Sequence, residues 1–277
     1  MNISSVIITF NPDISNLTNN INTFCKDVNF VILVDNSTEI QIKNEIKNLA
    51  VKSDYIYLDM FGNSGIANAL NQGIKIAKKL NSVWVLTMDQ DSYFLSGISE
   101  YKDYLKINNT DNTLLLYPAY SISNNIELFL GEKFVMQSGN LLNIDIYNKI
   151  GIYRDDYFID FVDYEYCLRG NRFGYKIKNI SNVLLQHNTG EKKIFNLLGL
   201  NLTYFVSNPI RYYYVTRNGL DTALRYKNFK ILSITLKLFF RVLLIENSKK
   251  LKIIYISKGF IHFCFSKFGP LLKNHKI

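Results

Sequence analysis

The sequence contains little cysteine and no recognisable export signal, and both shortages limit what the chain can be. Its three cysteines among 277 residues, Cys25, Cys167 and Cys264, lie far apart in no metal-ligand spacing, and their odd number argues against a disulfide framework. We therefore expect a reducing compartment. The opening MNISSVIITF lacks the basic region, long apolar run and cleavage site of a signal peptide, which indicates a first core strand instead.

The sequence also lacks an internal repeat, a low-complexity linker and a hydrophobic run long enough to cross a membrane. Its most apolar segment, ILSITLKLFFRVLLI, is short and is interrupted by Lys237 and Arg241, whereas a spanning helix needs roughly 20 apolar residues. This segment favours a helix that lies on a membrane surface. A helix packed on the catalytic core fits the same pattern equally well.

Acidic residues are scarce in only one part of the chain. Up to Glu191 there are 16 Lys and Arg against 21 Asp and Glu, a net charge of −5, and from Lys192 onward there are 16 against 2, a net charge of +14. Such a basic block binds nucleic acid, an anionic membrane or diphosphates. Its apolar and aromatic neighbours favour the membrane. Because it contains no recognisable nucleic-acid-reading module, we do not expect nucleic acid as a partner.

Short apolar runs alternate with amphipathic stretches through the first half of the chain, which is the pattern of βαβ units on a parallel sheet. Strands are expected at Ser5–Phe10, Phe30–Val34, Tyr55–Leu58, Val83–Met88 and Leu114–Pro118. Helices are expected between them, at Ile14–Phe24, Ile40–Leu49 and Ile66–Leu80. The sequence thus predicts an α/β fold with a mainly parallel sheet covered on both faces.

From about Phe195 the pattern changes to longer helical stretches. They are Pro209–Tyr226, Phe229–Ile245 and Leu251–Phe268, with Gly269-Pro270 as a stop signal. We therefore predict a catalytic domain over residues 1–227 and a basic amphipathic helical tail over residues 228–277 that associates with a membrane.

Polar residues follow each of the first four expected strands, where parallel α/β sheets bind ligands. The segments are TFNPD from Thr9, DNS from Asp35, GNSG from Gly62 and DQDS from Asp89. Asp89 and Asp91 repel each other at the end of a buried strand unless a cation or hydrogen-bond donors compensate, and their oxygen atoms suit Mg²⁺ or Mn²⁺. Because D-x-D is a common pattern, a solvated turn is the alternative.

Three further features are candidates for the site. The segment from Gly62 to Gly73 enters a helix whose first turn offers backbone N–H groups, without the spacing of a dinucleotide fingerprint. If a helix runs through FIDFVDYE, Asp160 and Asp163, three residues apart, can share a face, and a carboxylate held beside another acid is a candidate general base; an acidic helix N-terminus is the alternative. His187 follows an apolar run and alone indicates a core or turn histidine.

Together these segments resemble the family 2 glycosyltransferases and, within them, the bacterial rhamnosyltransferase-like branch. The resemblance runs from Val6 to about Arg225 and is carried by ITFNPD, VDNS, GNSGIANALNQGI, LTMDQDS, MQSGNLL, FIDFVDYEYCLR, LLQHNTG and RYYYVTRN. It implies a GT-A fold, a nucleoside-diphosphate sugar donor such as dTDP-rhamnose or a UDP-sugar, and Mg²⁺ or Mn²⁺. It also implies inverting transfer to a glycan or lipid-linked acceptor in bacterial surface polysaccharide synthesis. With the basic tail, it predicts a cytoplasmic enzyme that is peripheral at the inner face of the cell membrane.

The resemblance further implies roles for single residues. Those assigned to the nucleotide sugar are Thr9, Asn11, Asp35, Asn63, Asp89, Gly139, Arg211 and Arg217, the last two near a diphosphate or a phosphate-bearing acceptor. The metal ligands are Asp91, Asp89 and His187. Asp163 matches the catalytic carboxylate, with Asp160 in reserve because the common Glu-Asp pair of the family is Val162-Asp163 here.

Two other classes of protein share parts of this pattern. One is a non-catalytic, membrane-associated interaction protein that keeps the fold. The other is a sugar nucleotidyltransferase, although no Gly-rich triphosphate loop with Arg or Lys follows the first strand. The sequence leaves open the donor sugar, the acceptor, the linkage and the oligomeric state, a homodimer included.

Overall fold

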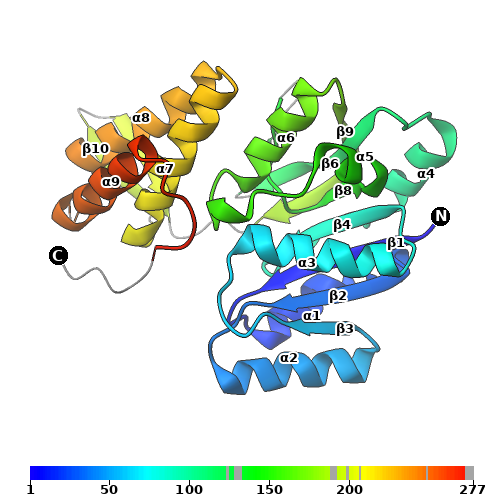
Figure 1. The fold of residues 1–277 in the computed structure, drawn as a ribbon. Coiled ribbons are helices and arrows are strands. Elements are labelled where there is room, and N and C mark those ends of the chain that lie inside the picture. Colours follow the sequence, from blue (N-terminus) through cyan, green and yellow to red (C-terminus); the bar gives the residue numbers. More distant parts are fainter. Residues whose placement is uncertain are drawn as a thin grey trace.

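The computed structural model describes residues 1–122, 125–127, 133–187, 192–197, 200–205, 207–247 and 249–271. The last three residues of the LLQHNTG segment and the end of the predicted tail lie outside these ranges. Most of the described chain forms one mixed β-sheet with the helices that cover it, and the rest forms a two-stranded hairpin and three helices (Figure 1).

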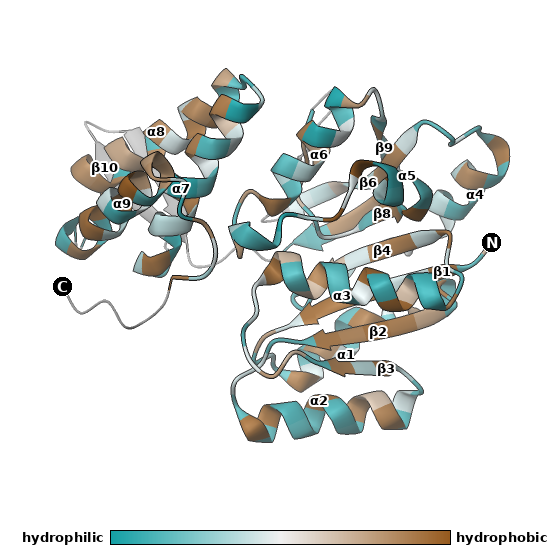
Figure 2. Cartoon of the chain, viewed as in Figure 1, coloured by the Kyte–Doolittle hydropathy of each residue, from teal (hydrophilic) through white to brown (hydrophobic). Residues whose placement is uncertain are grey.

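The first half of the sheet is parallel and is formed by β3 (Ile56–Asp59), β2 (Phe30–Asp35), β1 (Ile3–Thr9) and β4 (Trp84–Asp89), in that spatial order. β1, β2 and β4 form where β-branched and leucine side chains are buried on both faces, as inner parallel strands require, whereas the edge strand β3 is only partly buried. Figure 2 colours β1 and β2 as hydrophobic along most of their length. The α/β class and the mainly parallel character of this half agree with the sequence prediction.

The crossover helices cover both faces of this parallel half. The helices α1 (Ile14–Asn22) and α2 (Ile40–Ser53) contact each other, and α3 (Ile66–Lys79) packs on β1 and β2 from the opposite side (Figure 1). Gly73 allows this close approach, because a Cβ atom there would lie 2.4 Å from Val6 Cγ1. Buried Ala67 and Ala69 continue the small surface of α3.

The second half of the sheet is mixed. Beyond β4 the order continues through β8 (Asn140–Asn143), β6 (Thr113–Ile122), β9 (Lys176–His187) and β5 (Ser92–Phe94), while β7 (Asn125–Glu127) pairs with β6. Only the β6–β9 pair is parallel among these. The helices here are α4 (Ser99–Ile107), α5 (Ile144–Ile150) and α6 (Val162–Arg172), and two short 3₁₀ turns are η1 (Cys25–Asp27) and η2 (Asp155–Tyr157).

The C-terminal region corrects one prediction. A change to longer helical stretches was expected from about Phe195, with the first helix at Pro209, but β10 (Lys192–Leu197) and β11 (Leu200–Phe205) form an antiparallel hairpin, which was not predicted, before the helices begin. The β-branched and aromatic residues of this segment favour strand pairing, which the expected change to helical spacing overlooked. Side-chain Oδ1 of Asn208 then caps the next helix by accepting from Ile210 N–H.

The last three helices pack on one another. They are α7 (Pro209–Arg225), α8 (Phe229–Leu244) and α9 (Lys249–Cys264), and they lie as a group on the side toward which the parallel strands point (Figure 1). Gly259 of α9 sits so close to α7 that an added Cβ would lie 2.5 Å from the Tyr213 carbonyl oxygen. The division of the chain at residues 227 and 228 falls between α7 and α8 and stays a prediction.

Candidate active site

The carboxyl end of β4 brings two acids and a histidine together. Asp89 is the last residue of β4, and Asp91 follows two residues later. The short strand β5 then pairs with the end of β9 in a register that places Ser92 opposite His187. As a result, ligand atoms of Asp89, Asp91 and His187 all lie within 4.8 Å of one another. The pairing of β5 with β9 therefore places His187 beside the two acids, whereas the sequence alone left its role open.

The electrostatics of this cluster favour a cation. Burial raises the pKa of Asp89 to about 6; the charge of His187 opposes this rise and the charge of Asp91 adds to it. The Ser92 hydroxyl and His187 Nδ1 are hydrogen-bonded at 2.8 Å, which orients the imidazole ring. Carboxylate oxygens with an imidazole nitrogen fit Mn²⁺, and the carboxylates also suit Mg²⁺.

A cavity of about 360 Å³ adjoins this cluster. The sheet, the segment that enters α6, and helices α7 and α8 all contribute to its wall. Five of the predicted site residues line it, and they are Asp89, Asp160, Asp163, His187 and Arg211. The structure thus brings together residues that are more than 100 positions apart in the sequence.

Two acids on the cavity wall are held in different ways. The Asp163 carboxylate accepts hydrogen bonds from the backbone N–H groups of Gln137 (3.0 Å) and Tyr164 (2.9 Å). Burial raises the pKa of Asp163 to about 7. Asp160 is instead paired with the Arg211 guanidinium, whose side chain is 47% exposed at the rim. Asp163 is consequently a buried carboxylate that can take up a proton near neutral pH.

The predicted nucleoside-binding residues form a second group, at the ends of β1 and β2. The Thr9 hydroxyl donates to Asp35 at 3.0 Å, and the Tyr57 hydroxyl donates to the other oxygen of the same carboxylate at 2.9 Å. Asn11 bridges to the following loop, where its Oδ1 accepts from Thr38 N–H. Thr9 and Asp35 are fully buried. Their role as nucleotide ligands stays a prediction.

The remaining three predicted site residues, Asn63, Gly139 and Arg217, belong to none of these groups. Asn63 is exposed, and its side chain accepts from Gly65 N–H within the turn before α3. Gly139 is packed in the core, where a Cβ atom would lie 2.9 Å from Leu185 and from Pro118.

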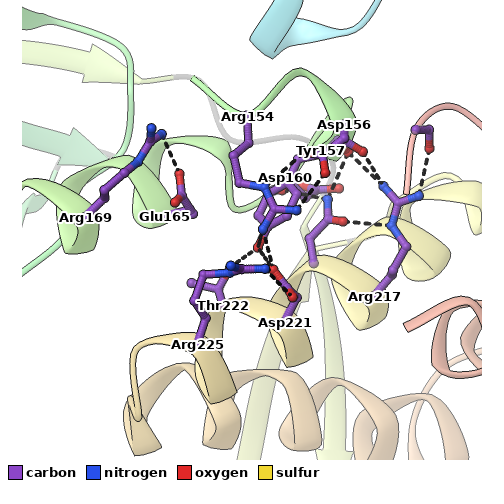
Figure 3. A network of polar contacts seen from close by, with 12 residues as sticks. Arg154, Asp156, Tyr157, Asp160, Glu165, Arg169, Arg217, Asp221, Thr222 and Arg225 are labelled. Atoms are coloured by element: carbon purple, nitrogen blue, oxygen red, sulfur yellow. Dashed lines mark hydrogen bonds and ion pairs between the residues drawn. The ribbon is translucent and has the colours of Figure 1, made fainter. Parts of the chain in front are cut away.

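Arg217 is fully buried and donates to the carbonyl oxygens of Asp156 and Tyr157, both at 3.1 Å (Figure 3). This burial disagrees with the prediction that Arg217 lies near the donor diphosphate or a phosphate-bearing acceptor, because its donors are occupied inside the protein by backbone carbonyls, the Asn218 amide oxygen and the Tyr213 hydroxyl.

Sequence reasoning missed two residues of the site beside Gly139. Ser138 Oγ accepts from Asp89 N–H at 3.1 Å and so fixes the end of β4. Gln137 lines the cavity and holds Asp163 through its backbone, and its buried side-chain Nε2 has no hydrogen-bond partner among the described residues. The MQSGNLL segment contains a signal for both residues, because Gln137 and Ser138 are polar side chains directly before Gly139. The prediction selected only the glycine.

Comparisons with known proteins agree with this geometry. The family model described as glycosyl transferase family 2 matches residues 4–159. The chain is 28% identical to the dTDP-rhamnosyl transferase RfbF of Shigella flexneri over 240 residues, which cover 79% of this chain and 78% of RfbF.

Solved structures show the same fold at low sequence identity. Residues 1–349 of S. aureus TarS, in complex with UDP-GlcNAc, align with a TM-score of 0.57 at 15% identity, covering 95% of this chain and 81% of that one. The chain spans 47% of a longer TarS structure. The mannosyltransferase PcManGT from Pyrobaculum calidifontis, in complex with GDP-Man and Mn²⁺, aligns with a TM-score of 0.60 at 10% identity, covering 96% and 87%.

The family match spans more than half of the chain, from β1 through the segment that carries Asp155 and Tyr157, and includes the Asp89 end of β4. The fold of these solved structures extends over the remainder. This chain belongs to glycosyl transferase family 2.

Proposed function

We propose that this chain is an inverting transferase that moves rhamnose, or a similar sugar, from a nucleoside-diphosphate sugar to a hydroxyl of a glycan or lipid-linked acceptor in bacterial surface polysaccharide synthesis. One observation carries the proposal: the Asp89, Asp91 and His187 cluster adjoins the cavity that Asp163 lines. The similarity to the rhamnosyl transferase RfbF favours dTDP-rhamnose as the donor, with a UDP-sugar as the next choice.

Asp91, Asp89 and His187 are the residues that would hold Mg²⁺ or Mn²⁺. An ion bound there supplies positive charge that offsets the charge developing on the departing diphosphate. The Ser92 hydroxyl occupies His187 Nδ1, so Nε2 is the nitrogen for the ion. Arg211 lies at the rim of the same cavity, where its guanidinium can exchange its contact with Asp160 for a diphosphate oxygen.

Asp163 is the proposed general base. It takes the proton of the acceptor hydroxyl as the hydroxyl oxygen bonds to the anomeric carbon, while the bond from that carbon to the diphosphate oxygen breaks and the nucleoside diphosphate leaves. One displacement inverts the anomeric centre. The two backbone N–H groups that bind the carboxylate aim it, and burial makes it basic enough to accept a proton near neutral pH.

The first test asks which donor the folded chain binds. Thermal unfolding is measured with dTDP-rhamnose, UDP-sugars and the free diphosphates, each with and without Mn²⁺, because a ligand at 100 times its Kd stabilises the fold by about 2.7 kcal/mol. We expect dTDP-rhamnose with Mn²⁺ to give the largest rise in Tm and to be consumed with release of dTDP.

The alternatives give different results. Pyrophosphate release from a nucleoside triphosphate identifies a nucleotidyltransferase. If no donor is hydrolysed or transferred while the fold remains intact, the chain is a non-catalytic protein with this fold. Unchanged transfer in excess EDTA contradicts the metal proposal.

The location at an anionic inner membrane is a second part of the proposal. Among the described residues, no helix has the length and hydrophobicity needed to cross a bilayer. α8 packs inward through Ile231 and Val242, but it also exposes Phe240 (57%) and Leu244 (71%), with Lys237 beside them. An exposed apolar stripe with basic neighbours is typical of helices that bind the membrane interface.

Liposome flotation tests this location on the full-length chain. The double substitution Phe240→Ser/Leu244→Ser is compared with Ile40→Ser/Val51→Ser, which removes two equally apolar side chains, each 77% exposed, from the distant helix α2. We expect wild type and the α2 variant to float with anionic liposomes at low salt, and the α8 variant to stay in solution. A soluble wild type with anionic liposomes at low salt contradicts the membrane location.

A further inference from the structure

The segment that carries the two acids of the cavity has an unusual backbone. Three residues that are not glycine, Phe158, Asp160 and Phe161, have φ angles of +67°, +63° and +62°. Phe158 has ψ −63°, and Ile159 N–H donates to the Tyr157 carbonyl oxygen at 2.8 Å, which closes a γ-turn of the rare strained kind. Such a conformation persists only where the surrounding structure imposes it.

Asn218 supplies much of that surrounding structure. Its side-chain amide nitrogen lies 2.9 Å from the Tyr157 carbonyl oxygen, 2.8 Å from that of Ile159 and 3.0 Å from that of Asp160. One side chain on α7 therefore bonds three carbonyls of the turn. The contacts are between residues about 60 positions apart.

Arg217 binds the beginning of the same segment. Its Nη2 donates to the carbonyls of Asp156 and Tyr157, and its Nη1 donates to the Gly269 carbonyl at 2.7 Å (Figure 3). Its Nε donates to Asn218 Oδ1 at 2.9 Å, which orients the amide so that its nitrogen faces the turn. The two side chains act as one unit, which we name the α7 clamp.

The clamp sits in a place where polar groups are costly. Arg217 and Asn218 are both fully buried. The guanidinium carbon lies 5.0 Å from the ring centre of Tyr213 and 5.2 Å from that of Phe268, so the cation is surrounded by aromatic faces and neutral carbonyl oxygens. A buried charge needs hydrogen bonds to offset its desolvation, and Arg217 makes two of them to carbonyl oxygens at the start of the turn, so the bonds that satisfy the cation also fix the backbone there.

The segment that the clamp holds bears directly on the cavity. It leads into α6, so its path sets where Asp163 lies in the first turn of that helix and where Asp160 faces Arg211. The Phe158 carbonyl also accepts from Ile66 N–H at 2.7 Å and so ties the same turn to α3. A displacement of the turn would move the carboxylates while leaving the sheet and its nucleotide edge in place.

We infer that Arg217 and Asn218 are positioning residues of the transfer reaction: they fix the strained turn that places Asp163 against the acceptor, and they touch neither donor nor acceptor. This inference rests on the proposed role of Asp163. It predicts a loss of turnover with little change in donor binding, since a misplacement of about 1 Å in a reacting group costs on the order of 10² in rate.

The test compares Asn218→Ala with Tyr226→Phe in the full-length chain. The control removes the 2.6 Å bond from Tyr226 to Glu165, which also joins the end of α7 to α6 but does not reach the turn. We expect Asn218→Ala to lower kcat roughly 30- to 100-fold with the donor KM within about threefold of wild type. We expect Tyr226→Phe to keep at least about half of the wild-type kcat.

Amide hydrogen exchange over residues 154–163 gives a readout that does not depend on transfer. Exchange there should rise in Asn218→Ala and not in Tyr226→Phe. If Asn218→Ala does not fold, Arg217→Lys, which keeps the charge but loses the planar set of donors, takes its place in both measurements.

The outcomes separate the two proposals. A wild type without transfer activity overturns the proposed function, and the exchange measurement then still decides whether the clamp fixes the turn. Equal kcat values for Asn218→Ala and Tyr226→Phe, or a rise in donor KM that accounts for the whole loss, overturn the positioning role.

Discussion

The two acidic segments of the site are positioned in different ways. Asp89 and Asp91 stand at the end of a regular parallel strand, where the register with β1 and the pairing of β5 with β9 fix their place. Asp160 lies within a strained segment that α7 holds from outside the sheet, and Asp163 follows it in the first turn of α6. The first geometry follows from local sequence and strand pairing, whereas the second depends on residues about 60 positions away.

This difference indicates a division of labour within the site. In the proposal the metal and the nucleotide bind at one edge of the sheet, where the side chains of β1, β2 and β4 are almost all buried. The turn and α7 form the opposite wall of the cavity, where the proposed acceptor would bind, and the α7 clamp fixes the path of that turn. Substitutions at the edge should therefore affect metal-dependent binding, and those at the turn should affect turnover.

The largest effect is expected at the edge. Asp91→Ala should lower transfer on the order of 10³-fold, because charge stabilisation at the leaving group is the largest single contribution to such reactions. It should also abolish the Mn²⁺-dependent part of the donor-induced rise in Tm. Asp91 is exposed, so the fold should persist, and Asp103→Ala, at another exposed acid, is the control. Retained Mn²⁺-dependent stabilisation by the donor in Asp91→Ala would contradict the ligand assignment.

A somewhat smaller effect is expected at the turn. Asp163→Asn should slow kcat on the order of 10²-fold or more while donor affinity stays nearly unchanged, because the amide cannot take the acceptor proton. Kinetics with varied donor and acceptor measure both quantities. Asp160→Asn is the matched comparison, since its carboxylate is engaged by Arg211. If Asp160→Asn has the larger effect on kcat, the two assignments must be exchanged.

The edge was predictable from the sequence and the turn was not. Apolar runs located β1 to β4 to within a residue or two, and the polar residues after them led to Asp89 and Asp91. Left-handed φ angles at Phe158 and Asp160 have no local signal, because neither residue type requires them. They result from tertiary hydrogen bonds. The burial of Arg217 was missed for the same reason, since a charged residue in a basic helix resembles a ligand-binding one.

The pH dependence of turnover tests the turn in another way. Burial raises the pKa of Asp163 to about 7, whereas an exposed aspartate titrates near 3.9. A base acts in its ionised form, so kcat/KM should rise about tenfold per pH unit below 7 and become level above it. Initial rates between about pH 5.5 and 8.5 measure this. A profile that is flat down to pH 5.5 would show that no carboxylate buried in this way acts as the base.

The smallest effect on catalysis is expected from a substitution that disturbs the packing of α3 on the sheet and contacts neither Asp160 nor Asp163. Gly73→Ala would place a Cβ atom 2.4 Å from Val6 Cγ1 and 3.0 Å from Val34 Cγ2, so α3 must move away from β1 and β2. Overpacking of this kind costs about 1–3 kcal/mol of the free energy of unfolding, and the better helix propensity of alanine offsets part of it. Tm should fall by several degrees, while kcat and donor KM stay within about twofold of wild type, because α7 and not α3 holds most of the turn.

Lys75→Ala, at an exposed position of the same helix, should change neither Tm nor rate. A large loss of kcat in Gly73→Ala would mean that the Ile66 to Phe158 contact at the start of α3, and not the α7 clamp, is the main support of the acceptor-side carboxylates.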